Sequence, residues 1–286
     1  MMKSKEILKH FCNLCQHETP CVKLYRLKGY DIVQCADCGL VYVAFGASPI
    51  VKVADIYSQD YFEGGVSDGY VEYSSNEEVL CHQAKRIIRQ IFPYQNSGTL
   101  LEIGCAYGFF LLEARKFFKV QGVEKSSFAA GQAKNRGLDV LVGDLPDLNL
   151  PKLNYSTVCL FDCIEHLTDP YGYLRHIHAL LEPKGLVVLT TGDINSFYAR
   201  IAGQKWRLMT PPQHLFYFSR RTMEKILEKT GFKVLKLSCP WKLVPWKLIL
   251  YQISPFLKSF LGPLGRLSAG IYINLYDVMF IIAQKE

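Results

Sequence analysis

The stretch "LLEIGCAYGFFL", residues 100–111, joins an apolar run to a loop that holds two glycines. The run from Thr99 to Cys105 has the length and the apolar content of a buried strand. Gly104 permits a tight turn directly after it, and Gly108 can open a helix whose amide groups point toward a ligand. A strand, a glycine turn and a helix in this order are typical of a ligand site at a strand end in an open α/β sheet.

From Gly98 onward, short apolar runs alternate with segments of helical spacing. The runs that follow the first are "KVQGVEKS" (119–126), "LDVLVGD" (138–144), "STVCLFDC" (156–163) and "GLVVLTTG" (185–192). This alternation predicts a parallel, doubly wound α/β sheet. The last two runs, "FKVLKLSC" (232–239) and "DVMFIIAQK" (277–285), have no ordinary crossover helix between them. We therefore expect them to pair antiparallel at one edge.

Acidic residues end the second and third strands of this pattern. Glu124 lies 20 residues after Gly104, where a carboxylate can accept both hydroxyls of a ribose. Asp144 follows the third strand, where a carboxylate can meet an adenine amino group. Because the carboxyl ends of parallel strands meet at one edge of the sheet, these positions together predict a nucleoside cofactor.

Four cysteines near the start form two C-x-x-C pairs with 19 residues between them: Cys12, Cys15, Cys35 and Cys38. This spacing is typical of a tetrahedral zinc site. Four thiolates leave no open position, so the zinc is expected to be structural. A segment of about 40 residues cannot build much core, and metal binding would supply its folding free energy. The stretches "YDIVQC" and "GLVYVAF" fit its short strands.

The later motifs resemble those of class I S-adenosylmethionine-dependent methyltransferases, in the branch that includes the ubiquinone-biosynthesis O-methyltransferases. The resemblance covers roughly residues 98–239 and 276–286. It rests on "LLEIGCAYGFFL", "VEKS", "GDL", "FDCIEHLTDP", "LLEPKGLVVLTT" and "PPQHLFYFSRRTMEKILEKTGF". It implies a Rossmann-like seven-stranded sheet and S-adenosylmethionine as the cofactor. A zinc-binding front module of this spacing resembles that of sugar C-methyltransferases and of many glycan-pathway methyltransferases.

The resemblance also implies a cofactor site made of eight residues near the strand ends: Glu102, Gly104, Ala106, Gly108, Glu124, Asp144, Leu145 and Asp162. The residues of the first loop would hold the methionine part of the cofactor, and Asp162 would face the methionine end of the cofactor. Glu124 would hold the ribose and Asp144 the adenine amine, with Leu145 beside the ring. Ala106 stands where the family has its middle glycine, and we expect it to substitute there with a negative φ.

Polar residues after the fourth and fifth strands are the candidates for catalysis. Asp162, Glu165 and His166 follow the fourth strand, and His214 lies in "TPPQHLFYFS" (210–219). A histidine of near-neutral pKa can take the proton that a hydroxyl loses on methylation, so His166 or His214, oriented by Glu165, is a candidate general base.

Two other interpretations of these residues stay open. The set of Asp162, Glu165, His166 and His214 resembles the divalent-ion site of the small-RNA 2′-O-methyltransferases, and such an ion would lower the pKa of the acceptor hydroxyl. In the interpretation without chemistry, Asp162 or Glu165 caps a helix start and the histidines tie a loop to the sheet.

We divide the chain into a zinc ribbon (1–45), an aromatic-rich linker with a helix (46–97) and an S-adenosylmethionine-dependent methyltransferase domain (98–286). The expected reaction methylates a hydroxyl, with carbon as the alternative, of a sugar, lipid-linked or other small-molecule acceptor. Two other classes stay open. One is a nicotinamide-dependent oxidoreductase, although the loop does not match G-x-G-x-x-G. The other is a non-catalytic zinc-ribbon scaffold with a degenerate cofactor fold.

An apolar, basic insertion at 240–275 interrupts the last domain. It has no acidic residue and is broken by three prolines, which argues for short amphipathic pieces. They fit either an interfacial membrane element or a helical flap or dimer contact. No basic motif interleaved with aromatics points to nucleic acid. Ten cysteines without a leading apolar signal predict a cytoplasmic location, peripheral to the membrane if the insertion binds one.

Overall fold

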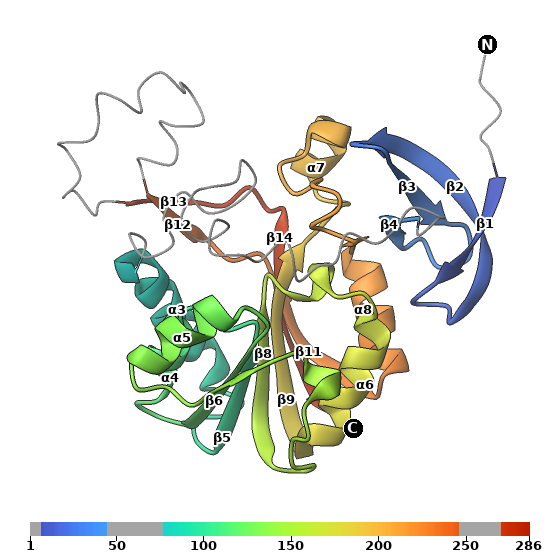
Figure 1. Ribbon diagram of the computed structural model, residues 1–286. Coiled ribbons are helices and arrows are strands. Elements are labelled where there is room, and N and C mark those ends of the chain that lie inside the picture. Colours follow the sequence, from blue (N-terminus) through green and yellow to red (C-terminus); the bar gives the residue numbers. More distant parts are fainter. Residues whose placement is uncertain (1–6, 45–76, 246–269) are drawn as a thin grey trace.

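The computed structural model describes residues 7–44, 77–245 and 270–286 (Figure 1). Two expected features lie outside the described residues: the aromatic stretch of the linker, within 46–76, and the middle of the insertion, 246–269. The helix expected at the end of the linker is present as α3 (Glu77–Ile91).

A seven-stranded sheet forms the centre of the main domain, in the order β11–β14–β9–β8–β5–β6–β7. The strands are β5 (Thr99–Ile103), β6 (Lys119–Glu124), β7 (Val140–Val142), β8 (Tyr155–Phe161), β9 (Leu181–Gly192), β11 (Phe232–Ser238) and β14 (Val278–Lys285). Strands β5 to β9 are parallel, and β14 runs antiparallel to both β9 and β11. The predicted sheet class and its antiparallel final pair are confirmed.

Helices cover both faces of this sheet because successive side chains of a strand point to opposite faces. Val188 of β9 packs in one cluster with Ile88 of α3, whereas its neighbour Val187 packs in another with Ile177 and Ile226. Helices α3, α4 and α5 lie on one side of the sheet, and α6 and α8 on the other (Figure 1). Their bounds are α4 (Phe109–Ala114), α5 (Ser127–Asn135), α6 (Pro170–Leu180) and α8 (Arg220–Lys229).

Short helical elements complete the connections at the carboxyl ends of the strands. They are the 3₁₀ turns η2 (Leu145–Asp147), η3 (Ile164–His166) and η4 (Gly203–Lys205) and the helix α7 (Phe197–Ala202). Both η2 and η3 begin within three residues of a strand end, so the acidic strand-end motifs sit in tight turns rather than in long loops.

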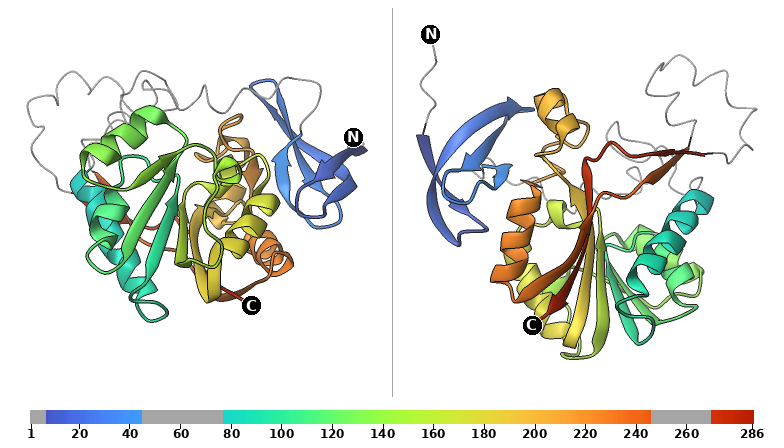
Figure 2. Two further views of the ribbon diagram at one scale, coloured as in Figure 1. Left: turned by 60° about the horizontal axis from the view of Figure 1, so that its bottom comes forward. Right: turned by 180° about the vertical axis from the view of Figure 1, so that it is seen from behind.

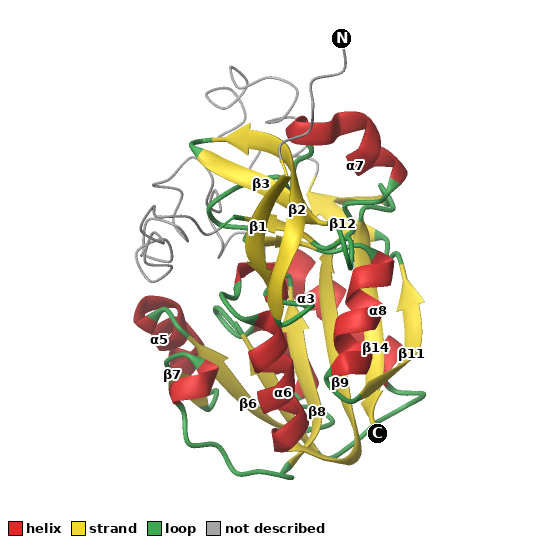
Figure 3. Ribbon diagram, turned by 90° about the vertical axis from the view of Figure 1, so that its right-hand side faces the viewer, coloured by secondary structure: helices red, strands yellow, loops and turns green. Residues whose placement is uncertain are grey.

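The N-terminal module is an antiparallel sheet beside α7 and α8, on the side away from α3 to α5 (Figure 2; Figure 3 views it face on). Its own strands are β1 (Ile7–Cys12), β2 (His17–Leu27), β3 (Tyr30–Cys35) and β4 (Val41–Val43). A fifth strand, β10 (Phe216–Tyr217), comes from the main domain and pairs with β4. The two parts of the chain therefore share one sheet, which sequence analysis did not predict.

The described ends of the insertion form strands, whereas the expected interfacial element, helical flap or dimer contact falls mainly on 246–269, outside the described residues. Strand β12 (Lys242–Pro245) pairs antiparallel with β13 (Gly270–Ile273) in a two-stranded sheet. Pro245 ends its strand, a position where a missing N–H is tolerated. No helix within the described ranges is long and apolar enough to cross a membrane.

Gly108 offers a test of how tightly the first loop is packed. Its φ is +78°, and a Cβ added there would overlap with Leu138 Cδ1. Gly137 has a similar φ of +75°, but a Cβ added there would meet nothing within 4 Å. Gly137→Ala should therefore lose about 1 kcal/mol of stability through the backbone alone.

Gly108→Ala adds a clash with the core and should lose about 1–3 kcal/mol more. Urea unfolding of both variants measures the difference. Equal losses would contradict the close packing of Gly108 against Leu138.

Candidate functional site

The loop between β5 and α4 has three residues in the left-handed region. Gly104 and Gly108 have φ of +72° and +78°, and Ala106 has φ of +47°. Our expectation of a negative φ at Ala106 was wrong. The strain, about 1–2 kcal/mol for a residue with a Cβ, is offset by a hydrogen bond: the Ala106 N–H donates to Glu124 Oε2 at 2.9 Å.

Glu124, at the end of β6, ties this loop to the next one. Its Oε1 accepts the N–H of Ser126 at 2.8 Å, while its Oε2 accepts that of Ala106. Burial raises the pKa of Glu124, and these backbone donors oppose the rise. Each carboxylate oxygen has a second lone pair, so the same group can also accept hydroxyls.

Glu102, on β5, is a buried acid at this edge. Burial raises its pKa well above the usual range, and the nearby charge of Glu124 raises it further. Its Oε2 makes no hydrogen bond within the described part of the chain. When protonated, this carboxyl group can present both a donor and an acceptor to the space in front of Gly104.

Asp144 and Leu145 follow β7 directly, as predicted. Asp144 forms an ion pair with Lys125 Nζ at 3.0 Å, and both side chains are partly exposed. Such a pair contributes little stability in water, so the carboxylate stays accessible to other partners. Leu145 is only 1% exposed and packs in the main core.

Asp162 follows β8 and is held by Thr190 of β9. The Asp162 N–H donates to Thr190 Oγ1 at 2.9 Å, and that hydroxyl donates to Asp162 Oδ1 at 2.8 Å. This exchange fixes Asp162 in the left-handed region at φ +48°. The interpretation of Asp162 or Glu165 as a helix cap is wrong. The cap of η3 is Cys163 without a side-chain bond, and the cap of α6 is Asp169.

A cavity of about 500 Å³ opens in front of this edge. Glu102, Gly104, Asp162 and Thr190 line it from the sheet side. Its other polar and aromatic walls are Arg86, Arg89, Phe110, Phe161, Lys236, Trp241 and Phe280. The cavity therefore combines apolar rings with three cationic side chains and the carboxyl group of Glu102.

Glu165, His166 and His214 form a cluster at the end of η3. One ligand atom from each lies within 4.8 Å of the others, and the two imidazole centroids are 4.7 Å apart. Asp162 is not part of this cluster of three, although its charge acts on both rings. The convergence of the three side chains from two distant segments was expected from the sequence only as one alternative.

Hydrogen bonds hold the His214 loop on η3. His166 Nδ1 donates to the carbonyl of Gln213 at 2.8 Å, so the proton sits on that nitrogen. The Leu215 N–H donates to the carbonyl of Glu165 at 2.8 Å. His214 therefore lies between two anchored residues.

Burial favours the neutral form of both imidazoles by lowering the pKa of each. Burial lowers the pKa of His214 to about 3, with a further contribution from the neighbouring His166. Burial also lowers the pKa of His166, against the hydrogen bond to Gln213. Neutral imidazoles with a carboxylate match the donor set of divalent metal sites, whereas a group of pKa near 3 accepts a proton from a hydroxyl poorly.

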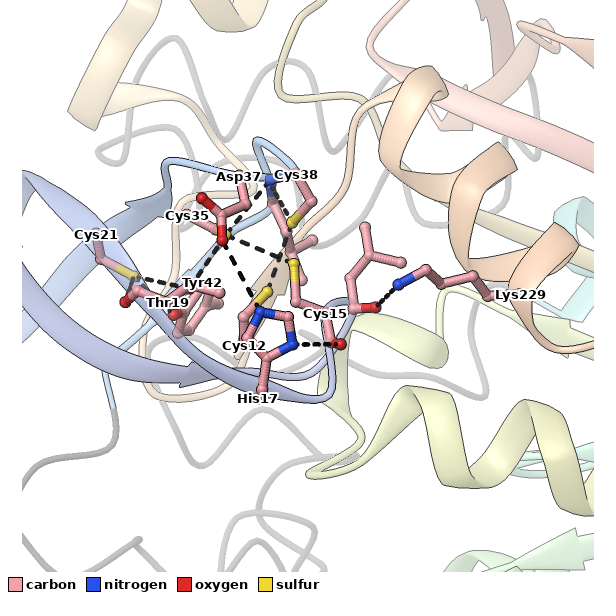
Figure 4. A network of polar contacts seen from close by, with 12 residues as sticks. Cys12, Cys15, His17, Thr19, Cys21, Cys35, Asp37, Cys38, Tyr42 and Lys229 are labelled. Atoms are coloured by element: carbon pink, nitrogen blue, oxygen red, sulfur yellow. Dashed lines mark hydrogen bonds and ion pairs between the residues drawn. The ribbon is translucent and has the colours of Figure 1, made fainter.

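The four ribbon cysteines converge on one point (Figure 4). Cys12 Sγ lies 3.5 Å from Cys38 Sγ, and Cys15 Sγ lies 3.9 Å from Cys35 Sγ. Sulfurs around a tetrahedral zinc with bonds of about 2.3 Å are about 3.8 Å apart. The donors therefore fit a structural zinc ion, and all four cysteines are free of disulfides.

Electrostatics of the four thiols favour a cation between them. Burial and neighbouring sulfurs raise the pKa of Cys15 to about 12, whereas the thiol of Cys12 lowers the pKa of Cys38 to about 5. The backbone also donates to sulfur, from Leu40 N to Cys38 Sγ at 3.4 Å. Such bonds stabilise thiolates around a bound metal.

A comparison with known families gives this site its context. Residues 74–237, more than half of the chain, match the model of a family described as methyltransferase domain. The chain belongs to this family. Its core is thus an S-adenosylmethionine-dependent methyltransferase domain, and the strand-end residues described above lie inside the matched range.

Two curated relatives of the methyltransferase domain are similar over their shared part. One, named "Probable S-adenosylmethionine-dependent methyltransferase" from Mycolicibacterium smegmatis, is 26% identical over 55% of this chain and 61% of its own length. The other, the ubiquinone biosynthesis O-methyltransferase of Ruegeria pomeroyi, is 27% identical over 50% of this chain and 66% of its own. The chain thus spans less than two thirds of either relative.

Solved structures agree with the methyltransferase fold. An S-adenosylmethionine-dependent methyltransferase of Thermotoga maritima, titled a possible histamine N-methyltransferase, superposes with a TM-score of 0.53 at 21% identity, over 79% of this chain and 98% of its own. Phosphoethanolamine N-methyltransferase 2 of Haemonchus contortus, solved in complex with S-adenosyl-L-methionine, superposes with a TM-score of 0.54 at 19% identity. That match covers 82% of this chain and 60% of the other. At these identities the likeness concerns the fold.

Several residues that line the cavity were missed from the sequence. Arg86 and Arg89 are three apart on α3, a spacing that places both on one helix face. The spacing of the two arginines was visible in the sequence, but nothing indicated that this helix face lies opposite the strand ends. In the sequence Thr190 looks like an ordinary β-branched strand residue. Its hydrogen-bond partner, Asp162, follows the neighbouring strand β8.

We expect one zinc ion per chain in the freshly purified, unchelated protein. Cys35→Ser should lose that zinc and lower the melting temperature, since metal binding supplies folding free energy to so small a module. Cys239→Ser, outside the cluster, is the matched control and should keep the zinc. Elemental analysis decides, and a metal-free wild-type protein would contradict the assignment.

Proposed function

We propose that this chain transfers a methyl group from S-adenosylmethionine to a hydroxyl of a small-molecule acceptor, a sugar or a lipid-linked compound. The observation that carries the proposal is the approach of Glu165, His166 and His214 just after β8, on the strand-end edge from which Asp162 lines the cavity. Methylation of a hydroxyl requires that a proton leave, and this cluster would assist that step. Transfer to carbon is the alternative outcome.

The cofactor would lie along the carboxyl ends of β5, β6 and β7. Its methionine part would contact Glu102, Gly104, Ala106 and Gly108, whose loop is fixed by Glu124. The residues for the other parts are Glu124 for the ribose, Asp144 for the adenine amine, Leu145 beside the ring and Asp162 toward the reacting end. Glu102 Oε2, which has no hydrogen-bond partner among the described residues, lies in the cavity wall and supports a polar ligand there.

Methyl transfer is an in-line displacement at a carbon that the sulfonium already activates. The protein therefore mainly has to align acceptor, methyl group and sulfur and exclude water. The aromatic walls of the cavity, with Phe110, Phe161 and Phe280, support such exclusion.

The depressed pKa of both imidazoles argues against either acting as the base alone. It favours a divalent ion on Glu165, His166 and His214, which fit it by donor type and by spacing. When bound, such an ion lowers the pKa of a coordinated hydroxyl. Asp162 would remain with Thr190 and supply negative charge to the site.

Charges around the cavity support an anionic acceptor. Arg86, Arg89 and Lys236 all line it. One cation is enough for the carboxylate of S-adenosylmethionine, which leaves the others for a phosphate such as that of a nucleotide- or lipid-linked sugar. The family match disfavours the nicotinamide alternative, and the scaffold alternative predicts no cofactor binding.

Glu124→Gln should weaken S-adenosylmethionine binding at least about tenfold. The change removes the carboxylate charge and one acceptor, and charge-assisted bonds contribute about 1.5–3 kcal/mol each. Calorimetric titration of S-adenosylmethionine measures the effect. Asp139→Asn, an acid at the opposite end of the sheet, is the control. An unchanged dissociation constant in Glu124→Gln would mean that the cofactor lies elsewhere.

His166→Ala and His214→Ala should each lower methyl transfer by about 10²–10⁴-fold while the S-adenosylmethionine dissociation constant stays within about twofold. His176→Ala, on α6, is the control. Transfer of labelled methyl is measured on nucleotide-linked sugars, lipid-linked sugars and phenols. Chelation that leaves the thiolate zinc in place should abolish transfer if a divalent ion acts. Normal turnover of both histidine variants would rule out this cluster.

A further inference from the structure

We propose that the zinc ribbon positions the histidine pair. Through the pairing of β4 with β10 it fixes the loop that carries His214 against Glu165 and His166. This inference rests on the proposed function only in that these three residues serve methyl transfer. It makes the four cysteines, which are remote from the chemistry, part of the geometry of the site.

The first link runs from the metal knuckle to the His214 loop. Cys38 is followed after two residues by β4, where the Val43 N–H donates to the carbonyl of Leu215 at 2.8 Å. Phe216 lies opposite Tyr42 in the same ladder, and their rings stack with centroids 6.3 Å apart. Leu215, Phe216 and Tyr42 are each at most 3% exposed, so water does not replace these contacts.

The second link runs from the loop to the cluster. Leu215, whose carbonyl is held by the ribbon, donates its own N–H to the carbonyl of Glu165 at 2.8 Å. Gln213, on the other side of His214, accepts from His166 Nδ1 at 2.8 Å. The main chain of one residue, Leu215, therefore joins the ribbon sheet to η3, and His214 is the residue next to it.

A separate contact joins the other knuckle to the segment after η3. Asn13 lies between Cys12 and Cys15, and its Nδ2 donates to Asp169 Oδ1 at 2.6 Å. Its Oδ1 accepts the N–H of Tyr171 at 2.9 Å. Asp169 caps α6 three residues after His166, so the first knuckle contacts the segment that follows η3, while β4 contacts the loop that carries His214.

A ribbon that only recruited partners would not need to supply hydrogen bonds to both the His214 loop and the segment that follows η3. A ribbon that positions them must keep its knuckles rigid, and four thiolates on one zinc ion do this. Displacement of His214 by about 1 Å is enough to cost about 10²-fold in rate.

The direct test compares Val43→Pro with Val43→Ala. Both variants remove the valine side chain, but only proline also removes the N–H that the Leu215 carbonyl accepts. The readouts are zinc content, S-adenosylmethionine affinity and the imidazole nitrogen resonances of His166 and His214, assigned with single histidine variants. In the wild type and in Val43→Ala, His166 should carry its proton on Nδ1.

In Val43→Pro we expect zinc and cofactor affinity to persist, while the resonances of His166 and His214 shift and methyl transfer falls about 10²-fold. Unshifted resonances in a folded, zinc-loaded Val43→Pro protein would overturn the proposal. If the proline variant does not fold, Cys35→Ser takes its place, with Cys239→Ser as the control outside the metal cluster. Loss of zinc removes the rigidity of the ribbon, so unshifted resonances in zinc-free Cys35→Ser would equally overturn the proposal.

The imidazole resonances separate this inference from the proposed function. Shifted resonances without any methyl transfer in the wild type would leave the positioning intact and remove the function. Active wild-type enzyme, with imidazole resonances that stay unshifted in the ribbon variants, would support the proposed function and remove the positioning role.

Discussion

The parallel pairing of β5 with β6 on one side and β8 on the other is the constraint on which the whole site depends. It brings the turns after three strands to one edge, so that Glu124 can accept the N–H of Ala106 from the neighbouring loop. That single bond holds a non-glycine residue in the left-handed region, and with it the shape of the loop in front of the cavity. Polar side chains are tolerated at this edge because the sheet's own hydrogen bonds end there.

A second constraint comes from outside the methyltransferase domain. The edge strand β4 of the ribbon pairs with β10, and β10 begins two residues after His214. The module therefore protects one of its own strand edges and fixes a loop that has only a short ladder of its own. A few hydrogen bonds link the ribbon, β10 and two partly buried imidazoles.

Local patterns in the sequence predicted much of this structure. Apolar runs with acidic ends indicated the strands of the sheet, and the spacing of Cys12 to Cys38 indicated a cluster whose sulfurs converge. Features set by distant partners were not readable. The φ of Ala106 depends on Glu124, the orientation of Asp162 depends on Thr190, and the pairing of Phe216 with Tyr42 joins segments far apart in the chain. The pairing of β12 with β13 likewise joins the two ends of a long insertion, so no local pattern announced it.

The most direct test is the fate of the methyl group. With isotopically labelled S-adenosylmethionine and the panel of phosphate-linked sugars and phenols, nuclear magnetic resonance of the product identifies the atom that receives it. We predict a methoxy carbon on an anionic acceptor, formed by the wild-type chain and lost in His214→Ala while cofactor binding persists. A methyl group on carbon, or a protein that binds no S-adenosylmethionine, would contradict this mechanism.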